Sequence, residues 1–457
     1  MTLKYLTPFP MTLFSKLKSI WQTDPLLRRV VKNSSFLFSG SSLGILFNLL
    51  ASVYATRALG VAGFGISGAI TNFAAVADKV FSFRIGELVI KYSGAALAEG
   101  DKNRAAAVFK TAALTEIGVS LLSYLLIVLL APLAALYFAK DASFAPYFVF
   151  YGLIVPAGFI FESGSALLQI GGNFRSQAAL NLSQSVVTAA IIIYAYLSES
   201  GLVVVLAAYL VGKTILGFGY AVFALRRAGQ LFGPDWWKVS FSHLPPWREF
   251  WGFAFSSNFS GSVNLFVRDS DILWINYFIG PVQGGYYKVA MALIGYMMMP
   301  VDPFIKTSFP EITRAIAEKA WGRLKNLLRR LTLISGTVTI GFGLALIVLG
   351  EPLIFRYIYE PEFLPAIIPA LILLVGYGTA NTLFWNRPLI LALGHATFPL
   401  AVMALVGTVK IALSFYLVPR YGMNAQAALM SAYFVLSIGI IVWRGLAEIK
   451  QREHSGQ

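Results

Sequence analysis

Four ionisable residues of this sequence lie inside long apolar stretches, with no opposite charge within four positions. They are Lys213, Lys410, Glu116 and Glu162. A charged side chain in an apolar environment is costly unless it is paired or hydrated, so such residues usually face a bundle interior or a water-filled cavity. There, a lysine without a carboxylate partner can bind an anionic group, and a carboxylate can take up a proton or a cation.

The predicted site combines cations for an anionic substrate with carboxylates for a coupling ion. Asp78 and Lys79 lie near the middle of an apolar stretch, where burial against lipid would be costliest. Arg84 and Arg268 are each followed by a carboxylate at a spacing of three, so local ion pairs are an alternative for both. For Glu162, the alternative is a bond to Lys213 across helices. We expect substrate binding at Lys213, Lys410, Arg268, Arg84 and Lys79, and ion coupling at Asp78, Glu162 and Glu116.

Several catalytic and cofactor motifs fail on inspection. Residues 63–68 have the glycine spacing of a dinucleotide-binding loop, but no strand precedes them. Gly212-Lys213-Thr214 lacks the first glycine of a phosphate-binding loop. Asp269 and Asp271 have the spacing used by some metal-dependent glycosyltransferases, although an ion pair with Arg268 is the simpler interpretation. The chain has no cysteine, and its three histidines have no metal-binding spacing. We expect no metal site and no cofactor apart from a coupling H⁺ or Na⁺.

The composition places these charges in a membrane. Of 457 residues, 57% are hydrophobic and 12% are charged, compared with about 45–50% and about 25% in soluble domains. A membrane-spanning helix needs about 20 mostly apolar residues. We predict an all-α polytopic membrane protein with 12 transmembrane helices, at residues 33–56, 64–90, 111–131, 145–167, 178–198, 201–225, 250–276, 286–310, 331–350, 364–385, 397–418 and 424–446.

The distribution of cations sets the expected orientation, because short cytoplasmic loops carry an excess of Lys and Arg. With the amino terminus inside, 25 of the 36 Lys and Arg residues fall on the cytoplasmic side and four on the outer side. We therefore expect a multi-pass protein of the plasma membrane with both termini cytoplasmic. The net charge of +15 then needs no nucleic-acid partner.

Two pairs of similar segments indicate an internal repeat. Residues 96–99 (Ala-Leu-Ala-Glu) are followed by Arg104, and residues 315–318 (Ala-Ile-Ala-Glu) are followed by Arg323, at an offset of 219. Residues 59–65 match residues 279–286 at offsets of 220 to 222. Chance similarity between Gly- and Ala-rich stretches is the alternative. The repeat predicts two six-helix lobes of parallel orientation, related by a pseudo-two-fold axis along the membrane normal, with a water-filled cavity between them.

The predicted organisation follows from this repeat. A basic cytoplasmic segment (1–32) precedes an N-lobe (33–225), an interfacial connector rich in tryptophan (226–249), a C-lobe (250–447) and a cytoplasmic tail (448–457). Pro156 should bend the fourth span, and Pro300 with Pro303 should bend the eighth near Asp302. Lys288 lies one turn from an outer helix end, so we expect its side chain to extend to the lipid headgroups.

These features together resemble one known group of membrane proteins. Besides the layout, the resemblance rests on the stretch Arg57-Ala58-Leu59-Gly60 and on residues 271–286. The chain is similar to the polysaccharide transporter (Wzx-type flippase) family of the multidrug/oligosaccharidyl-lipid/polysaccharide (MOP) exporter superfamily. The resemblance implies a V-shaped pair of six-helix lobes that opens alternately to either side. The implied substrate is a polyprenyl-diphosphate-linked oligosaccharide, which is moved to the outer leaflet for cell-surface polysaccharide biosynthesis.

The resemblance also implies ion-gradient coupling, a functional monomer and no enzymatic activity. Membrane lipid is an expected partner, and other glycan-assembly proteins are candidate partners. Two alternatives remain open at this point. The chain could be a cation-coupled multidrug exporter of the same superfamily, which would depend on Asp78 or Glu162. It could also be a membrane-embedded glycosyltransferase that uses Asp269 and Asp271, although its short outer loops argue against this.

Overall fold

The computed structural model describes residues 25–81, 85–246, 248, 250–252, 265–395 and 397–454. All regular secondary structure in these ranges is helical, and eight helical segments are long and apolar enough to cross a membrane. The prediction of an all-α polytopic membrane protein is therefore confirmed, whereas the number of 12 spans stays a prediction. With η marking 3₁₀- and π-helical segments, the order is α2 (Pro25–Phe81), α3 (Ile85–Leu88), η1 (Val89–Ser93), α4 (Gly94–Ala98), α5 (Lys102–Ala134), η2 (Ala135–Ala139), η3 (Ala142–Phe144), α6 (Ala145–Gly152), α7 (Ile154–Ala157), α8 (Phe161–Ile170), α9 (Phe174–Leu197), α10 (Gly201–Phe232), η4 (Trp236–Lys238), η5 (Phe241–His243), η6 (Leu265–Asp269), α12 (Asp271–Phe278), α13 (Pro281–Met298), α14 (Asp302–Ala317), α15 (Trp321–Leu349), η7 (Gly350–Tyr359), η8 (Pro361–Ala366), α16 (Ile367–Thr382), α17 (Asn386–Ala392) and α18 (Phe398–His454).

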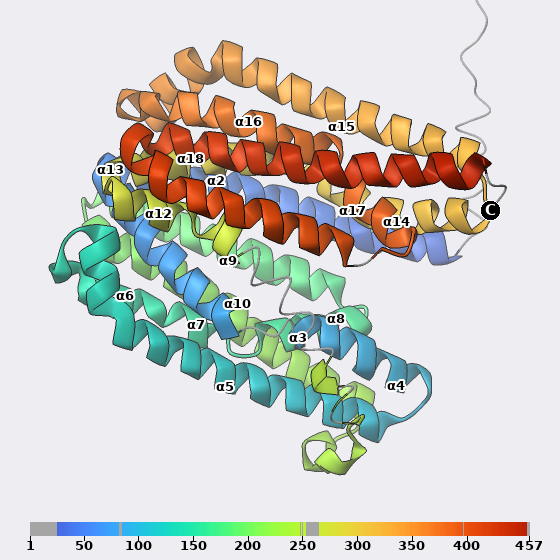
Figure 1. Ribbon diagram of the computed structural model, residues 1–457. Coiled ribbons are helices and arrows are strands. Elements are labelled where there is room, and N and C mark those ends of the chain that lie inside the picture. Colours follow the sequence, from blue (N-terminus) through green and yellow to red (C-terminus); the bar gives the residue numbers. More distant parts are fainter. Residues whose placement is uncertain are drawn as a thin grey trace, which may run out of the picture.

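The two longest helices each consist of two arms. Gly60 in α2 and Gly422 in α18 have positive φ angles of 62° and 69°, which interrupt the helix. Side chains other than glycine rarely adopt this conformation. In Figure 1 both helices double back, and the arms of α18 run side by side. The two predicted spans at each of these places therefore correspond to the two arms of one long helical element.

The helices of the two halves of the sequence gather on opposite sides of the molecule. Figure 1 shows α5, α6 and α10 on one side and α15, α16 and α18 on the other, with α2 and α9 between them. One end of the molecule carries the turns at Gly100 and Lys319 and the last helical residue, His454. We call it the basic end. The other end carries the turns at Gly60, Gly280 and Gly422, and we call it the opposite end.

The apolar cores show where the two halves meet. At the basic end each half has a core of its own, one around Phe109 and Phe232 and the other around Leu324 and Trp385. At the opposite end, side chains of both halves share one core, in which the rings of Phe64 and Phe363 lie 6.3 Å apart, centroid to centroid. The halves are therefore joined by apolar packing at the opposite end, whereas their cores are separate at the basic end.

Many large apolar side chains lie on the outer surface of the helices, as a lipid environment requires. On α5 they include Leu121 and Leu129, and on α15 they include Ile340 and Ile347. In water an exposed apolar surface of this extent would be unfavourable. The exposed faces therefore indicate which sides of the bundle contact lipid.

Both predicted proline breaks are present. Close to Pro156, α7 ends at Ala157 and the next helix, α8, begins at Phe161. Near Pro300, α13 ends at Met298 and α14 begins at Asp302. A proline lacks the backbone N–H that an uninterrupted helix uses, so both breaks follow from the sequence.

The two repeated basic turns have the same local structure. In the first, Glu99 ends α4 and pairs with Arg104 at 3.4 Å. In the second, Glu318 ends α14 and pairs with Arg323 at 2.8 Å. The residue after each glutamate has a positive φ angle, at Gly100 and Lys319. The sequence repeat thus corresponds to a repeated helix–turn–helix geometry at the basic end.

Candidate functional site

A cavity of about 310 Å³ brings together four of the predicted site residues. Asp78 comes from the second arm of α2, Glu116 from α5, Glu162 from α8 and Lys213 from α10. All the lining residues lie between positions 71 and 213, so this cavity is inside the N-terminal half. The sequence predicted the polar cavity between the two halves, and for these four residues that location is wrong. Three carboxylates face one lysine here, an arrangement that favours cations.

Glu116 binds the start of α8. Its carboxylate accepts hydrogen bonds from the backbone N–H groups of Glu162 at 2.7 Å and Ser163 at 3.0 Å, and from the Ser163 hydroxyl at 2.6 Å. The first N–H groups of a helix have no partner within the helix, and a carboxylate there also interacts favourably with the helix dipole. The break after Pro156 exposes these N–H groups, and Glu116 satisfies two of them.

Lys213 lies in the cavity without a salt bridge. Its Nζ is 4.2 Å from the centroid of the Phe161 ring, a cation–π contact. Among the described residues no carboxylate lies within ion-pair distance of this nitrogen, so the alternative of a Glu162–Lys213 bond is wrong. Gly158, in the break between α7 and α8, leaves room for the lysine, because a Cβ there would lie 2.8 Å from Lys213 Cε.

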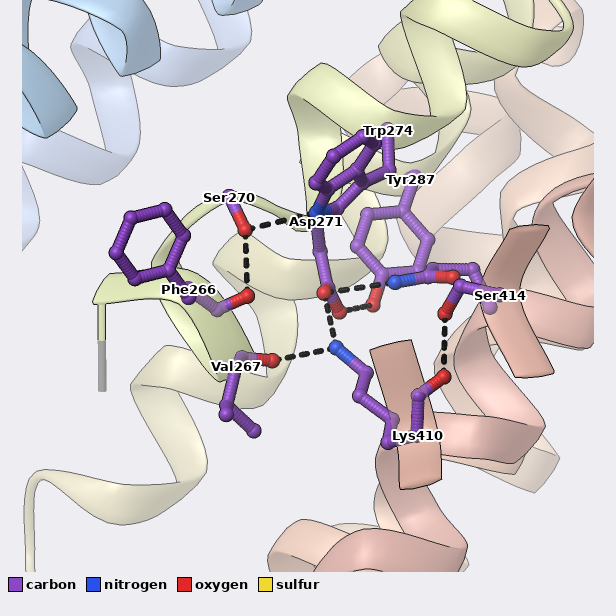
Figure 2. Close-up of polar contacts among 9 residues, drawn as sticks. Phe266, Val267, Ser270, Asp271, Trp274, Tyr287, Lys410 and Ser414 are labelled. Carbon is purple, nitrogen blue, oxygen red and sulfur yellow. Dashed lines mark hydrogen bonds and ion pairs between the residues drawn. The ribbon is translucent and has the colours of Figure 1, made fainter. Parts of the chain in front are cut away.

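Lys410 lies outside this cavity and has a carboxylate partner. Figure 2 shows its Nζ against Asp271 and against the backbone carbonyl of Val267, which is 2.5 Å away. The side chains of Lys410 and Asp271 are 3% and 2% exposed. The expectation that Lys410 lacks a partner is therefore wrong, because Asp271 lies 139 positions away and only the fold brings the two together.

Two further cations lie close to where the halves meet. Lys79 Nζ donates a hydrogen bond to the Asp269 carboxylate at 2.6 Å, an ion pair that links the second arm of α2 to η6. The Arg268 guanidinium lies 5.1 Å from the centroid of the Phe434 ring. The local pair expected between Arg268 and Asp271 is wrong, since the carboxylate of Asp271 binds Lys410 instead. Arg84 lies outside the described residues.

Lys288 is a further cation inside the bundle, and it was not among the site residues predicted from sequence. It is half-buried on α13, and its Nζ donates a hydrogen bond to Ser67 Oγ on α2 at 2.9 Å. The same nitrogen lies 4.1 Å from the centroid of the Phe64 ring. In the described part of the chain, Lys288 makes no ion pair with a carboxylate. The expectation that it extends to lipid headgroups is wrong, because the second arm of α2 covers the path along which the side chain would leave the bundle.

The repeated glycine segments pack directly against each other at the opposite end. A Cβ at Gly65 would lie 1.7 Å from the carbonyl oxygen of Pro281, and a Cβ at Gly285 would lie 2.3 Å from that of Val61. Gly65 lies four residues after Val61, and Gly285 lies four residues after Pro281, so each glycine meets the carbonyl four residues before the other glycine and the two contacts are reciprocal. Asn276 adds a hydrogen bond from its side-chain amide to the Gly65 carbonyl at 3.2 Å. Small residues let α2 and α13 approach this closely.

The carboxylates of Asp269 and Asp271 bind different partners, so they do not form one metal-binding pair. Across the described ranges, no group of three or more His, Cys, Asp or Glu side chains is placed to hold a metal ion.

Comparisons with known proteins agree with this architecture. Residues 30–316 match the family described as polysaccharide biosynthesis protein. The inner membrane protein YghQ of Escherichia coli (strain K12) is 21% identical over 335 residues, which cover 73% of this chain and 94% of that protein.

Two solved structures share the fold over almost the whole chain. An inward-facing multidrug resistance MATE family transporter of the MOP superfamily matches with a TM-score of 0.68 at 12% identity, over 91% of this chain and 96% of that one. The lipid II flippase MurJ in an inward closed conformation matches with a TM-score of 0.61 at 16% identity, over 93% and 90%. The chain therefore belongs to the polysaccharide biosynthesis protein family and has the fold of MOP-superfamily membrane transporters.

Proposed function

We propose that this protein is a flippase that moves a polyprenyl-diphosphate-linked oligosaccharide from the inner to the outer leaflet of the plasma membrane. The observation that carries the proposal is that two lysines, Lys213 and Lys288, lie inside the bundle and form no ion pair with any described carboxylate. Aromatic rings or a hydroxyl hold both ammonium groups. Lys288 can therefore bind a diphosphate directly, and Lys213 can do so once the carboxylates of its cavity carry H⁺ or Na⁺. The family match and the likeness to a lipid II flippase support the same substrate class.

The proposed architecture has 12 spans in two parallel six-helix lobes related by a pseudo-two-fold axis. The repeated basic turns support it, and so does the reciprocal contact between Gly65 and Gly285, because equivalent residues meet each other at a two-fold axis. The cations of the basic end support the proposal that both termini are cytoplasmic. We propose that this arrangement, with the halves joined at the opposite end, is the inward-facing state of an alternating-access cycle.

Transport in this direction needs no ATP. The substrate carries about two negative charges, and moving each outward across an inside-negative membrane gains about 2.3 kcal/mol per 100 mV. We propose that Asp78 and Glu162 exchange H⁺ or Na⁺ in the N-terminal cavity to reset the carrier. Three carboxylates and one lysine line that cavity, and this excess of acidic groups supports the role.

The test is flipping of a fluorescent polyprenyl-diphosphate-linked saccharide in proteoliposomes. We expect Lys213→Gln and Lys288→Gln each to lower the flipping rate about tenfold or more, as the loss of one charge-assisted hydrogen bond implies. Lys325→Gln is the matched control, because Lys325 pairs with Glu453 on the surface of the basic end and should leave the rate unchanged. Wild-type rates in both Gln variants would show that the headgroup does not bind here.

A cation-coupled multidrug exporter is the second candidate, and the acidic cavity favours it. Lipophilic cations would bind to Asp78, Glu162 and the Phe161 ring, which line that cavity together. Efflux of a cationic dye that is lost in Asp78→Asn and unchanged in Lys213→Gln and Lys288→Gln would select this function. The converse pattern, with flipping lost in the lysine variants and no dye efflux, would select the flippase.

A further inference from the structure

The buried polar cluster around Lys410 in the C-terminal half has the composition of a cation site. Lys410 Nζ is bound by a carboxylate oxygen of Asp271 and by the carbonyl oxygen of Val267. The same Asp271 oxygen accepts a hydrogen bond from Gln426 Nε2 at 2.7 Å, and the other oxygen accepts one from Tyr287 at 2.8 Å. Figure 2 shows the lysine nitrogen pointing into this group of oxygens.

The cluster is built at a break in a helix. Val267 belongs to the π-helical segment η6, and Asp271 is the first residue of α12. Broken helices of transporters use such backbone carbonyls, together with acidic side chains, to bind Na⁺ or H⁺. Monovalent and divalent hard cations prefer oxygen ligands of this kind. The oxygens of Val267 and Asp271 are therefore ligands suited to a small cation, and here an ammonium group contacts both.

Neighbouring residues hold the ammonium in place. Gly407 lies one turn before Lys410 on α18, and a Cβ there would lie 2.4 Å from Val267 Cγ2, so glycine is needed for this approach of α18 to η6. Gln426, on the second arm of α18, has a buried Oε1 with no hydrogen-bond partner among the described residues. Five helical segments thus meet at one charge: η6, α12, α13 and both arms of α18.

We propose that Lys410 is a tethered cation that permanently fills a monovalent-cation site in the C-terminal half. Asp271 is then neutralised by the chain itself, and this half exchanges no ion during transport. The inference concerns only the C-terminal half and does not depend on which substrate is moved. Its consequence is that removal of the ammonium should convert the cluster into a binding site for a free cation.

The experiment uses the full chain purified in detergent. The variants are Lys410→Ala, the double variant Lys410→Ala/Asp271→Asn, and Lys325→Ala, which removes a lysine from the exposed pair with Glu453 as a matched control. Apparent melting temperatures are measured against increasing Na⁺ or methylammonium, with N-methyl-D-glucamine keeping the ionic strength constant. Binding of radioactive Na⁺ at equilibrium is measured on the same samples.

We expect Lys410→Ala to melt below wild type and to recover saturably with Na⁺ or methylammonium. This variant should bind one more Na⁺ per chain than wild type. The double variant should show no such gain because it lacks the carboxylate of Asp271. Lys325→Ala should show none because Lys410 still fills the buried cluster and the Lys325–Glu453 pair is exposed. If Lys410→Ala does not fold, Lys410→Gln replaces it, since Gln keeps a polar group without the charge. A Lys410 variant with no additional cation response, or a wild-type protein with the same response, would overturn the proposal.

Discussion

Replacement of Glu116 separates two roles that its position allows. The sequence predicts an ion-coupling carboxylate, whereas the structure shows a carboxylate that accepts three hydrogen bonds at the start of α8. Glu116→Gln keeps the size of the side chain but turns one acceptor into an NH₂ donor that faces N–H donors. If the capping role dominates, this substitution should destabilise the protein even when no ion is transported.

The structure sets the magnitude of this effect. Loss of a helix cap costs about 0.5–2 kcal/mol, and each buried N–H group left unsatisfied costs about 1–3 kcal/mol. In Glu116→Ala both N–H groups, of Glu162 and Ser163, lose their acceptor, and in Glu116→Gln one of them does. Glu116 lines the cavity, so water can replace part of the interaction. We therefore expect Glu116→Gln and Glu116→Ala to lower the free energy of unfolding by about 2–4 kcal/mol.

The assay compares apparent melting temperatures in detergent with transport in proteoliposomes. Asp78→Asn is the matched control, because Asp78 is exposed to the same cavity and makes no hydrogen bond with another described residue. It should reduce coupled transport with little change in melting temperature. A Glu116→Gln variant that melts like wild type but loses ion coupling would refute the capping role and restore the role predicted from sequence.

Two further predictions concern the contact between the halves at the opposite end. Gly65→Ala places a Cβ 1.7 Å from the carbonyl oxygen of Pro281, so we expect it to weaken the closed end and increase its labelling by water-soluble reagents. Gly118→Ala, which meets nothing within 4 Å, should leave labelling unchanged. In this cysteine-free chain, Arg57→Cys/Glu360→Cys joined through two disulfides by a short bis-methanethiosulfonate should block transport until a reductant cleaves those disulfides, since the residues approach to 3.9 Å across the halves. Full transport by the cross-linked protein would contradict the assignment of this end as a gate.

The long helices could be predicted from sequence because they are apolar runs, and two of the breaks follow from proline. The break after Pro156 and the break between Met298 and Asp302 needed no tertiary information. What the sequence could not supply was the end of α10, which continues to Phe232, seven residues beyond the predicted N-lobe. Hydrophobicity marks the part of a helix in lipid, whereas the helix itself can extend into the aqueous phase.

The charged residues were predicted less well, because their partners are distant in sequence. The spacing rule that paired Arg268 with Asp271 assumes a regular α-helix. Here the chain changes from the π-helical turn of η6 to α12 between these two residues, which alters their relative direction. Asp271 therefore meets Lys410 instead. The prediction for Lys288 used only its distance from the end of the predicted span. Its side chain instead binds Ser67, which lies 221 positions away in the sequence.

The internal repeat carried more structural information than the individual charges did. The segments it matched, around Gly65 and Gly285, turn out to contact each other, each glycine against a carbonyl oxygen of the other segment. Such a reciprocal contact requires small residues in both halves at once, and both segments have glycine at this place. This contact joins the halves at the opposite end while the cores of the basic end stay separate, so the proposed alternating-access cycle requires the contact to break when the opposite end opens.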